Sequence, residues 1–395
     1  MEISKKYRLK YVFLEALYWS SVCPVSGFMV AYMQSKGYSS TYLGIMMAVS
    51  NIVLAFLQPL IASAVDRSEK LTLRMVNVTF TLITLISCIL MIVTDNVVWA
   101  LTGVVTLAIT TVNAMQPFTN AVSVELSEKG IDVNFGFCRA FGSLAYAITS
   151  TVTGKLMSSM GYDVMPYISI VILVLLLISC LIMDDGSKYG KEAVRQQADD
   201  KEEAKSLGRF LADNKKFCLF LLATICIFHT HMASNNYLIN VVENVGGDSA
   251  SQGVAASIGA LCELPVMLLF SFLCSRFKVQ NLIKLGGVFF VIKFILLTIG
   301  SSIPAIYAAE IFQGFSYAVL IPANVYYVGH LFSGADMNKG QSLSTAAMCV
   351  ATVTASIIGG YFIDAYGVTT MMTVSTAISA VGVVILFLSL EEFKE

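Results

Sequence analysis

The first candidate binding site is one arginine in a stretch that is otherwise small, apolar or aromatic, "NFGFCRAFGSLAYA", residues 134–147. Arg139 and Tyr146 are seven residues apart, so on a helix they lie two turns apart on one face. The small residues Gly142 and Ser143 lie between them. A planar guanidinium with five donors, beside an aromatic ring and open space, suits a hydroxylated or anionic ligand. The alternative is an interfacial arginine whose head group reaches the aqueous phase.

A second candidate is a set of three charged residues in three different apolar runs: Glu263, Lys293 and Glu310. Charged side chains inside a membrane are costly, so they face a partner or a water-filled cavity. Two carboxylates and one ammonium leave one acid in excess, and that acid is the easier one to protonate. The set is therefore suited to proton coupling. The alternative is a static group that holds three helices together.

A third candidate is the segment "HTHMASNNY", which starts at His229. His231, Ser234 and Asn235 are spaced i, i+3 and i+4 and share one helix face, whereas His229 points elsewhere. A histidine titrates near neutrality and can carry a proton, although a packing role is the alternative. Glu15, in the first turn of the first apolar run, is interpreted as an interfacial residue.

The composition defines the environment in which these residues act. Of 395 residues, 56% are apolar and only 13% are charged, and the mean hydropathy is +0.75. Soluble domains have about 25% charged residues. Apolar runs of about 18–24 residues, long enough to cross a ~30 Å hydrocarbon core as a helix, recur twelve times. Because they are apolar on all sides, they do not resemble barrel strands, which alternate.

The sequence therefore predicts an all-α membrane protein with twelve transmembrane helices in two six-helix bundles. The predicted spans are residues 11–33, 42–65, 72–94, 97–120, 135–158, 164–183, 216–240, 251–273, 281–299, 303–327, 341–363 and 368–390.

The distribution of Lys and Arg predicts the orientation. With a cytoplasmic N-terminus, 21 of the 25 are cytoplasmic, Lys36 and Lys155 are outside, and Arg139 and Lys293 are within helices. The basic start "MEISKKYRLK" resembles that of a signal peptide, but the apolar run after it is too long for one. We expect a multi-pass protein of the inner or plasma membrane with both termini in the cytoplasm.

A charged segment divides the chain into two halves. We expect an N-terminal six-helix bundle at 1–185, a cytoplasmic linker at 186–214 and a C-terminal six-helix bundle at 215–395. The halves repeat short glycine patterns. In one repeat, Gly154 and Gly161 correspond to Gly360 and Gly367. In the other, Gly44 is followed 23 residues later by Arg67, and Gly253 is followed 23 residues later by Arg276. Parallel halves are typical of transporters, whose substrate site lies near the bilayer midplane between them.

Several other functions are not supported by the sequence. A net charge of −1 argues against a nucleic-acid partner, and no phosphate-binding glycine loop indicates an ATPase. The nine cysteines show no metal-ligand or CxxC spacing and are interpreted as small apolar fillers. No nucleophile and base converge within the spans, so we expect no enzyme, no cofactor and no metal. We expect a monomer, and a transport-inactive sensor stays an alternative.

The loop after the second span, "ASAVDRSEKLTLR", resembles the cytoplasmic signature loop of the major facilitator superfamily. Asp66, Arg67 and Arg74 match the pattern, while its glycines are absent. The resemblance extends over essentially the whole chain. It implies that Asp66 and Arg67 gate the cytoplasmic side through charge contacts between the halves.

Within that superfamily the chain resembles the branch of lactose permease and the oligosaccharide:proton symporters, which includes phenylpropionate-type permeases. The matching segments are "QPLIASAVDR", "QPFTNAVSVELSEKGIDVNFGFCRAFGSLAYA" and "LCELPVMLL", with a weaker match in "AYAAEIFQGFSYAVLIPANVYY". The resemblance implies that Arg139 binds sugar hydroxyls and that a ring at Tyr146 stacks on the sugar. It also implies that Glu263 and Lys293 occupy the positions of the family's Glu and Arg.

The chain departs from this pattern at several charges. Where the family pairs its arginine with a carboxylate late in span four, this chain has Asn120, with Asn113 and Gln116 on roughly the same side. An amide cannot neutralise Arg139, so we expect a site of net positive charge that favours an anionic substrate. Glu125 and Glu128 lie too near the loop to replace the carboxylate.

The C-terminal half departs as well. In span ten the family's Lys, His and Glu are replaced by Glu310, Gln313 and Ser316. In span seven His231 and Ser234 lie near positions that are acidic in the family. Proton coupling, if present, must therefore use a different set of groups.

These observations predict a secondary transporter that works by alternating access, with protons as the coupling ion and the lipid bilayer as its surroundings. We expect symport of a small glycoside, an oligosaccharide or an aromatic or carboxylic acid. Proton-antiport efflux of drugs or metabolites is the alternative. The predicted substrate-binding residues are Arg139, Tyr146, Asn120, Gln116, His231 and Asn235. The predicted coupling residues are Glu263, Lys293, Glu310 and Gln313.

Overall fold

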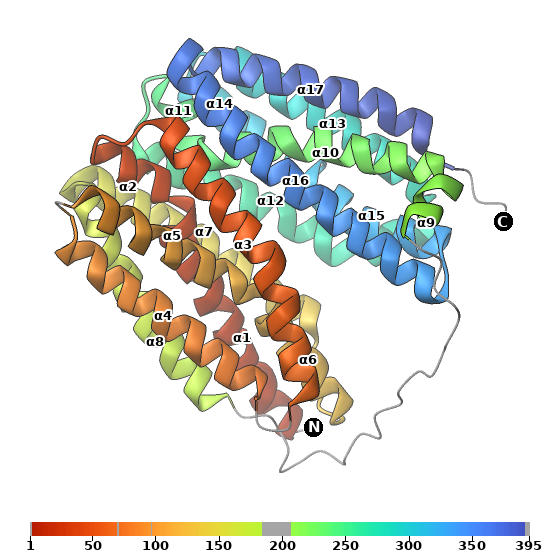
Figure 1. The fold of residues 1–395 in the computed structure, drawn as a ribbon, viewed down its shortest axis with the longest axis horizontal. Coiled ribbons are helices and arrows are strands. Elements are labelled where there is room, and N and C mark those ends of the chain that lie inside the picture. The colour runs from red at the N-terminus through yellow and green to blue at the C-terminus, as the bar shows by residue number, and fades with distance from the viewer. Residues whose placement is uncertain (1, 69–70, 96, 184–206, 392–395) are drawn as a thin grey trace. The chain divides into compact units, whose positions relative to one another are not determined.

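The computed structural model describes residues 2–68, 71–95, 97–183 and 207–391 (Figure 1). Within these ranges every regular element is a helix and no strand occurs, which confirms the all-α class. Ten helical stretches of the described chain are long and apolar enough to cross a membrane, by length and composition. They coincide with ten of the twelve predicted spans.

The first six predicted spans correspond to helices in the order expected. They are α1 (Glu2–Val22), the π-helix η1 (Cys23–Gly27) and α2 (Met29–Ser35); α3 (Ser40–Arg67); α4 (Leu73–Val93); α5 (Val98–Ala114) and α6 (Gln116–Glu128); α7 (Phe135–Met160); and the short 3₁₀ helix η2 (Tyr162–Val164) with α8 (Met165–Ile182).

The last six spans are also helical. They are α10 (Lys215–Asn236), followed by the short α11 (Leu238–Glu243); α12 (Ser249–Arg276); α13 (Val279–Ile299); α14 (Ile303–Ile311) and α15 (Tyr317–Leu331); α16 (Gly334–Tyr366); and α17 (Val368–Ser389).

Two predicted spans do not appear among the ten apolar stretches. Helix α7 has 26 residues, about 39 Å of helix at 1.5 Å per residue, but it is not among the stretches that are apolar enough to cross a membrane by composition. The other span is divided into α14, with nine residues, and α15, with fifteen. The count of twelve therefore stays a prediction.

The break between α14 and α15 matters for the candidate site. Residues Phe312–Ser316 leave the helical path, and Gly314 lies against α12, where an added Cβ would lie 2.4 Å from the Cys262 carbonyl oxygen. Helix breaks at membrane depth are tolerated only where the freed backbone is covered by protein or lines a cavity. Here the break brings Gln313 close to α12 and α13.

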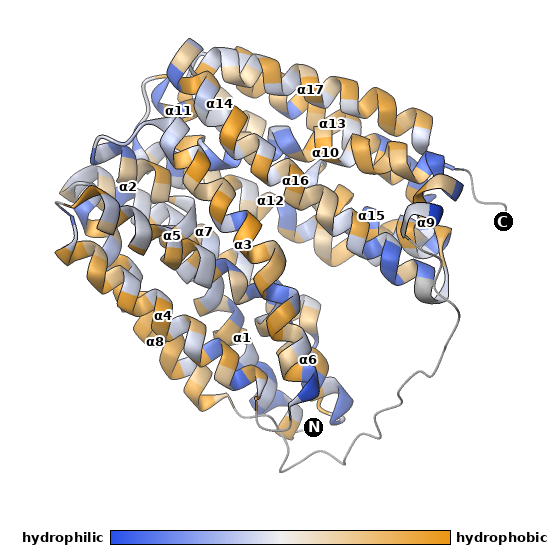
Figure 2. Cartoon of the chain, viewed as in Figure 1, coloured by the Kyte–Doolittle hydropathy of each residue, from blue (hydrophilic) through white to orange (hydrophobic). Residues whose placement is uncertain are grey.

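The helices are apolar toward the outside, as expected for a chain solvated by lipid. Figure 2 shows mainly hydrophobic residues along α4, α8 and α17. Large apolar side chains such as Phe56, Trp99 and Leu388 are exposed. Hydroxyl groups instead join buried faces: the Ser50 and Thr110 hydroxyls lie 2.8 Å apart. Such hydrogen bonds are common between helices in membranes.

Two compact units make up the chain. The first contains Met1–Tyr38, Val49–Arg195 and Asp248–Ala260, and the second contains Ser39–Ala48, Gln196–Gly247 and Leu261–Glu395. Helices α3 and α12 contribute residues to both. The predicted bundle boundaries at 185 and 215 stay a prediction. Of the predicted linker 186–214, residues 186–206 lie outside the described part, and Leu207–Asp213 forms helix α9.

The repeated glycines mark two equivalent helix crossings. In the first unit, a Cβ on Gly154 of α7 would lie 2.3 Å from the Ser249 carbonyl oxygen of α12, and one on Gly253 would lie 2.3 Å from the Ser150 carbonyl oxygen. In the second unit, Gly44 of α3 and Gly360 of α16 meet in the same way. Only glycine permits backbones to approach so closely. The sequence repeat is thus a repeat of packing.

Candidate substrate and coupling sites

Arg139 lies in the second turn of α7. Asn134 caps the N-terminus of that helix: it has a left-handed conformation (φ 52°), and its side chain accepts a hydrogen bond from the Phe137 backbone N–H (3.2 Å). Arg139 Nη1 donates to the Ser143 hydroxyl at 2.8 Å. Its guanidinium carbon lies 4.0 Å from the centre of the Trp19 ring on α1, a cation–π contact. These two contacts hold the half-buried Arg139 side chain against α7 and α1.

Gly142 allows this contact. A Cβ at that position would lie 2.6 Å from Trp19 Cδ1. The absence of a side chain lets the indole lie against α7, where its face meets the guanidinium. The small residues that were predicted to leave space for a ligand thus also leave space for a second aromatic residue.

A carboxyl group accompanies this arginine, on a different helix from the one considered in the sequence. Glu15 of α1 is fully buried, with 0% exposure, so its interpretation as interfacial is wrong. Its oxygens accept from the Tyr11 hydroxyl at 2.8 Å and from Trp19 Nε1 at 3.2 Å. Glu15 lies within electrostatic range of Arg139, although no direct ion pair joins them in the described chain. The expectation of a site with net positive charge did not consider Glu15, and it stays a prediction.

The predicted amide partners of Arg139 do not bind it. Gln116 is exposed, and Asn120 is half-buried with a buried Oδ1 that has no hydrogen-bond partner among the described residues. Asn113 donates to the Ser26 hydroxyl at 3.4 Å. Tyr146 is half-buried, and its hydroxyl oxygen would lie 3.0 Å from a Cβ on Gly27. Roles for Asn120, Gln116 and Tyr146 in substrate binding stay predictions.

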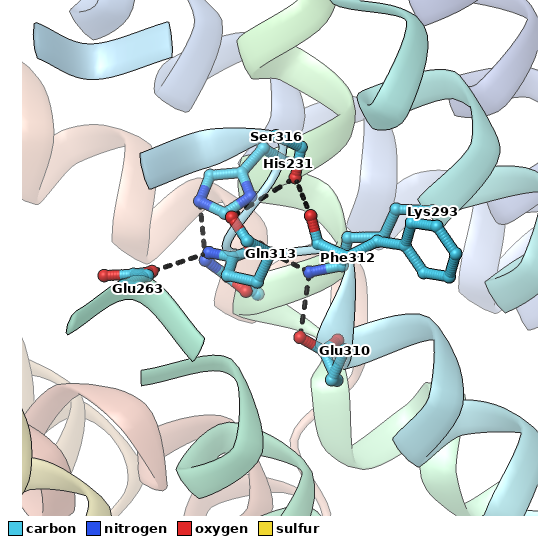
Figure 3. Close-up of polar contacts among 8 residues, drawn as sticks. His231, Glu263, Lys293, Glu310, Phe312, Gln313 and Ser316 are labelled. Atoms are coloured by element: carbon cyan, nitrogen blue, oxygen red, sulfur yellow. Dashed lines mark hydrogen bonds and ion pairs between the residues drawn. The ribbon is translucent and has the colours of Figure 1, made fainter. Parts of the chain in front are cut away.

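In the second unit, Lys293 of α13 is fully buried and directly paired. Its ammonium lies 2.8 Å from Glu310 Oε2 and 2.6 Å from Gln313 Oε1 (Figure 3). Glu310 is 4% exposed, and its Oε1 has no hydrogen-bond partner among the described residues. The charge of Lys293 is thus matched by one carboxylate at contact distance.

Gln313 connects Glu263 to Lys293: its carbonyl oxygen accepts from Lys293, and its Nε2 donates to Glu263 Oε1 at 2.9 Å. The break between α14 and α15 makes this possible, because it directs Gln313 between α12 and α13. Figure 3 shows Gln313 between Glu263 and Lys293. The predicted triad is therefore a chain of four residues, Glu263, Gln313, Lys293 and Glu310.

His231 lies beside this chain. It is 2% exposed and stacks on Tyr317, with ring centres 4.4 Å apart and planes 24° apart. Its Nε2 lies 3.0 Å from Asn235 Nδ2, as the i, i+4 spacing predicts. His229 lies on another face, 3.1 Å from the Thr354 hydroxyl of α16. The Nδ1 of His231 has no hydrogen-bond partner among the described residues, so its role in binding or coupling stays a prediction.

The predicted gating pair lies at the end of α3. Asp66 and Arg67 are both exposed in its last turn, and residues 69–70 of the signature loop lie outside the described part. The gating role stays a prediction.

Two residues of the first site were missed in the sequence: Tyr11 and Trp19. The signal that could have found them is their spacing, since each lies four residues from Glu15, on opposite sides. Residues four apart share a helix face. A carboxylate flanked in this way by a phenol and an indole has two neutral donors within reach, as the structure shows.

Comparison with known proteins places this chain among transporters. The model of the family described as "MFS_1 like family" matches residues 7–388. The uncharacterized transporter YwbF of Bacillus subtilis is 24% identical over 212 residues, 54% of this chain and 51% of that protein. That match spans about half of the relative's length. Maltose permease of Geobacillus stearothermophilus is 22% identical over 371 residues, 90% of this chain and 88% of that protein.

A solved structure supports the same fold. A mutant of the nucleoside transporter NupG superposes with a TM-score of 0.81 at 17% identity, covering 97% of this chain and 98% of that one. The family match over nearly the whole length and the apolar helices are consistent with each other. The chain belongs to the MFS_1 like family, and it is a multi-pass membrane transporter of the major facilitator superfamily and not an enzyme.

Proposed function

We propose that this protein is a secondary active transporter that works by alternating access and symports a small organic substrate with protons. The substrate is a glycoside, an oligosaccharide or an aromatic or carboxylic acid. The observation that carries the proposal is the chain Glu263, Gln313, Lys293 and Glu310 inside the second unit.

The charges of this chain favour the binding of one proton. Lys293 and Glu310 form a neutral pair with both side chains buried. Glu263 adds a second carboxylate, which gives the four-residue chain a net charge of −1 when both acids are ionised. A net charge is costly at low dielectric constant. Binding of one proton to these four residues therefore lowers their electrostatic energy. Glu263 is half-buried and accepts a hydrogen bond from Gln313, so it is our candidate proton carrier.

Gln313 couples Glu263 to the ion pair of Lys293 and Glu310. Its amide is oriented with oxygen toward Lys293 and nitrogen toward Glu263. Because an amide does not titrate, Gln313 cannot carry the proton itself. It can only change the orientation of its side chain. A change at Glu263 therefore alters the hydrogen bond to Lys293, and it does so at a break between two helix segments. A helix break is a place where small changes in orientation are possible without disrupting a continuous hydrogen-bond ladder.

The proposal is tested by separating accumulation from exchange in proteoliposomes, with radiolabelled maltose as the first probe and a panel of saccharides and monocarboxylates after it. Glu263→Gln mimics the protonated acid. We expect this variant to lose accumulation under an imposed pH gradient and to retain exchange, which needs no net proton movement. Glu128→Gln, an exposed acid at the end of α6, is the matched control and should accumulate substrate like the parent.

The same experiment distinguishes the alternatives. If Glu263→Gln and Glu310→Gln both accumulate substrate like the parent, the four residues have only a structural role. His231 then becomes the next candidate proton carrier. Loss of substrate from the vesicles under an inwardly directed proton gradient would indicate antiport. Binding of a probe without exchange of any probe would indicate a transport-inactive sensor.

A further inference from the structure

A cavity lies in the first unit where α4 begins and α8 ends. It contains about 380 Å³ of space, part of which is open to solvent. Its apolar walls include Leu14 of α1, Leu126 of α6 and Cys180 of α8, which are all buried. Arg74 of α4, which is exposed, and Glu125 of α6, which is half-buried, also line it. The cavity therefore combines buried apolar walls with charged groups that solvent can reach.

Asn77, in the second turn of α4, places a polar group in this cavity. The residue is only 2% exposed, and its Oδ1 has no hydrogen-bond partner among the described residues. A buried acceptor that lacks a donor is unfavourable, and such groups are usually paired with the protein, with water or with a ligand. A ligand that brings an N–H or O–H group into the cavity would satisfy Asn77.

The second unit fills the corresponding place with its own chain. Gln280, in the first turn of α13, is buried like Asn77, and its Nε2 donates to the Glu391 carbonyl oxygen at 3.2 Å. The Glu391 N–H donates to the Tyr327 hydroxyl of α15 at 3.0 Å, and the Tyr327 ring packs on Phe220 of α10 with ring centres 4.8 Å apart. By chain order, α10, α13 and α15 correspond to α1, α4 and α6. The first unit has a cavity where the second has these contacts.

The charged groups of the cavity favour a ligand that carries both charges. Arg74 lies in the first turn of α4, a turn without acidic residues, and the N-terminus of a helix favours an anion. Its guanidinium also donates to the Leu181 carbonyl oxygen at the end of α8. Glu125 supplies a carboxylate, whose Oε1 accepts from Lys129 at 2.8 Å. An anion therefore suits Arg74, and a cationic donor suits Asn77 and Glu125.

The surface beside the cavity is apolar and suits hydrocarbon chains. Met75 of α4 is 51% exposed, and Leu181 and Ile182 of α8 are 49% and 56% exposed. Figure 2 shows mainly hydrophobic residues along both helices. The exposed apolar side chains further along them include Leu82, Ile86, Val174 and Ile178. A ligand with hydrocarbon chains can therefore lie against α4 and α8 while its polar end enters the cavity.

We propose that this cavity binds the head group of a phospholipid with a primary ammonium group, such as phosphatidylethanolamine. The phosphate lies at Arg74 and the α4 N-terminus, and the ammonium donates to Asn77 and Glu125. A choline head group carries no N–H, so it cannot satisfy Asn77. The proposal goes beyond the transport function and does not depend on proton coupling.

The test is a lipid titration of the delipidated full-length protein, measured by native mass spectrometry. The probes are phosphatidylethanolamine, phosphatidylcholine and phosphatidylglycerol with identical acyl chains, and the soluble glycerophosphoethanolamine. We expect the ethanolamine lipid to bind at least about tenfold more tightly than each of the others, because only it brings the ammonium donor and the chains together. Equally tight binding of the choline or glycerol lipid overturns the proposal. Equally tight binding of glycerophosphoethanolamine would assign the cavity to a soluble ligand and overturn the lipid.

Two variants test the assigned contacts. Asn77→Leu keeps the volume and removes the unpaired acceptor, so we expect it to lose the preference for ethanolamine over choline without a lower unfolding temperature in lipid-free detergent. A purely structural role of Asn77 would instead lower that temperature and leave the preference unchanged. Arg74→Gln should weaken binding of both lipids, since both carry the phosphate. The control is Arg276→Gln, at an exposed arginine that ends α12, and it should bind like the parent.

Arg74→Gln keeps the proposal open to refutation even if Asn77→Leu does not fold, because Arg74 is exposed. If Arg74→Gln binds the ethanolamine lipid as tightly as the parent does, the phosphate is not bound at α4 and the proposal fails. If Asn77→Leu is folded and retains the tenfold preference, the ammonium is not bound in the cavity and the proposal also fails.

Discussion

The two units hold oppositely charged side chains in different ways. In the second unit, Lys293 and Glu310 are in contact at 2.8 Å, and both are almost fully buried. In the first unit, Glu15 and Arg139 are not in contact, and Trp19 lies between them as a hydrogen-bond donor to one and a π-face for the other. A direct pair satisfies its own charges, whereas a separated pair keeps donors and acceptors available. This difference fits the prediction that Arg139 binds substrate and the proposal that proton coupling uses residues of the second unit.

The two clusters also differ in the backbone that supports them. Arg139 lies within the long helix α7 and Trp19 lies in the last turn of α1, just before the π-helix η1, and Gly142 permits their close contact. Gln313 lies in a break between α14 and α15. A rigid support suits a site that must recognise a shape, and a broken helix suits a group that changes its orientation. The difference in support therefore matches the difference in proposed role.

The largest expected effect is on the direct ion pair. Lys293→Met leaves Glu310 buried without its counter-charge, and breaking a buried pair from one side costs about 3–5 kcal/mol. We expect a marked loss of thermal stability in detergent. The double variant Lys293→Met with Glu310→Gln should recover most of that loss, because no buried charge remains unpaired. A double variant as unstable as the single would show that the pair does not act as a unit.

Removal of the charge in the separated pair should be less harmful to folding. Arg139→Met leaves Glu15 with its two neutral donors, and loss of charge-assisted hydrogen bonding costs about 1.5–3 kcal/mol. We expect a smaller fall in thermal stability than in Lys293→Met, together with at least a tenfold loss of ligand affinity. If Arg139→Met is as unstable as Lys293→Met, the two units do not differ in the way described. If its ligand affinity is unchanged, Arg139 does not contact substrate.

The spacing between Trp19 and α7 is tested by Gly142→Ala. The added Cβ would lie 2.6 Å from the indole, and accommodating such a group typically costs about 1–3 kcal/mol. We expect lower stability in thermal unfolding and weaker substrate binding than in the parent protein. Gly103→Ala on α5 is the control, because its Cβ would meet no atom within 4 Å. Equal behaviour of the two variants would show that the close contact is not needed.

The smallest expected effect on stability is at Glu263. In Glu263→Gln the side-chain carbonyl can still accept from Gln313, so we expect a change below about 1 kcal/mol, the typical net value of one hydrogen bond. Glu310→Gln should cost more, because it removes the counter-charge of Lys293. Thermal unfolding of both variants measures the order. The reverse order would mean that Glu263, and not Glu310, compensates the ammonium.

The repeated glycines show how far a sequence pattern can lead. Gly44, Gly154, Gly253 and Gly360 are recognisable as a repeat in the sequence. The structure gives the repeat a physical meaning, because each lies where two helix backbones cross and a Cβ would meet a carbonyl oxygen. Gly161 and Gly367 have a different role, since both have a positive φ at the end of a helix. One repeat therefore contains two distinct uses of glycine.

The sequence by itself determined the membrane environment, the helical class, the positions of ten spans and the buried charges Lys293 and Glu310, but not the buried Glu15. Those features depend on composition and on local periodicity, which are properties of neighbouring residues. Insertion into a membrane strengthens the prediction of helices, because every backbone group in lipid must be paired within its own helix. The i, i+4 pairing of His231 and Asn235 is a local feature of the same kind, and the structure confirms it.

The tertiary structure alone decided which charges meet. Arg139 has its carboxyl neighbour on α1, 124 positions earlier, and not on α6 (139 − 15 = 124). Glu263 is linked to Lys293 through Gln313, which reaches both only because the helix breaks at Phe312–Ser316. Pairing between helices depends on their rotation and crossing, which are set by the packing of many small side chains at once. A single sequence lists the charged residues, but the geometry of packing selects their partners.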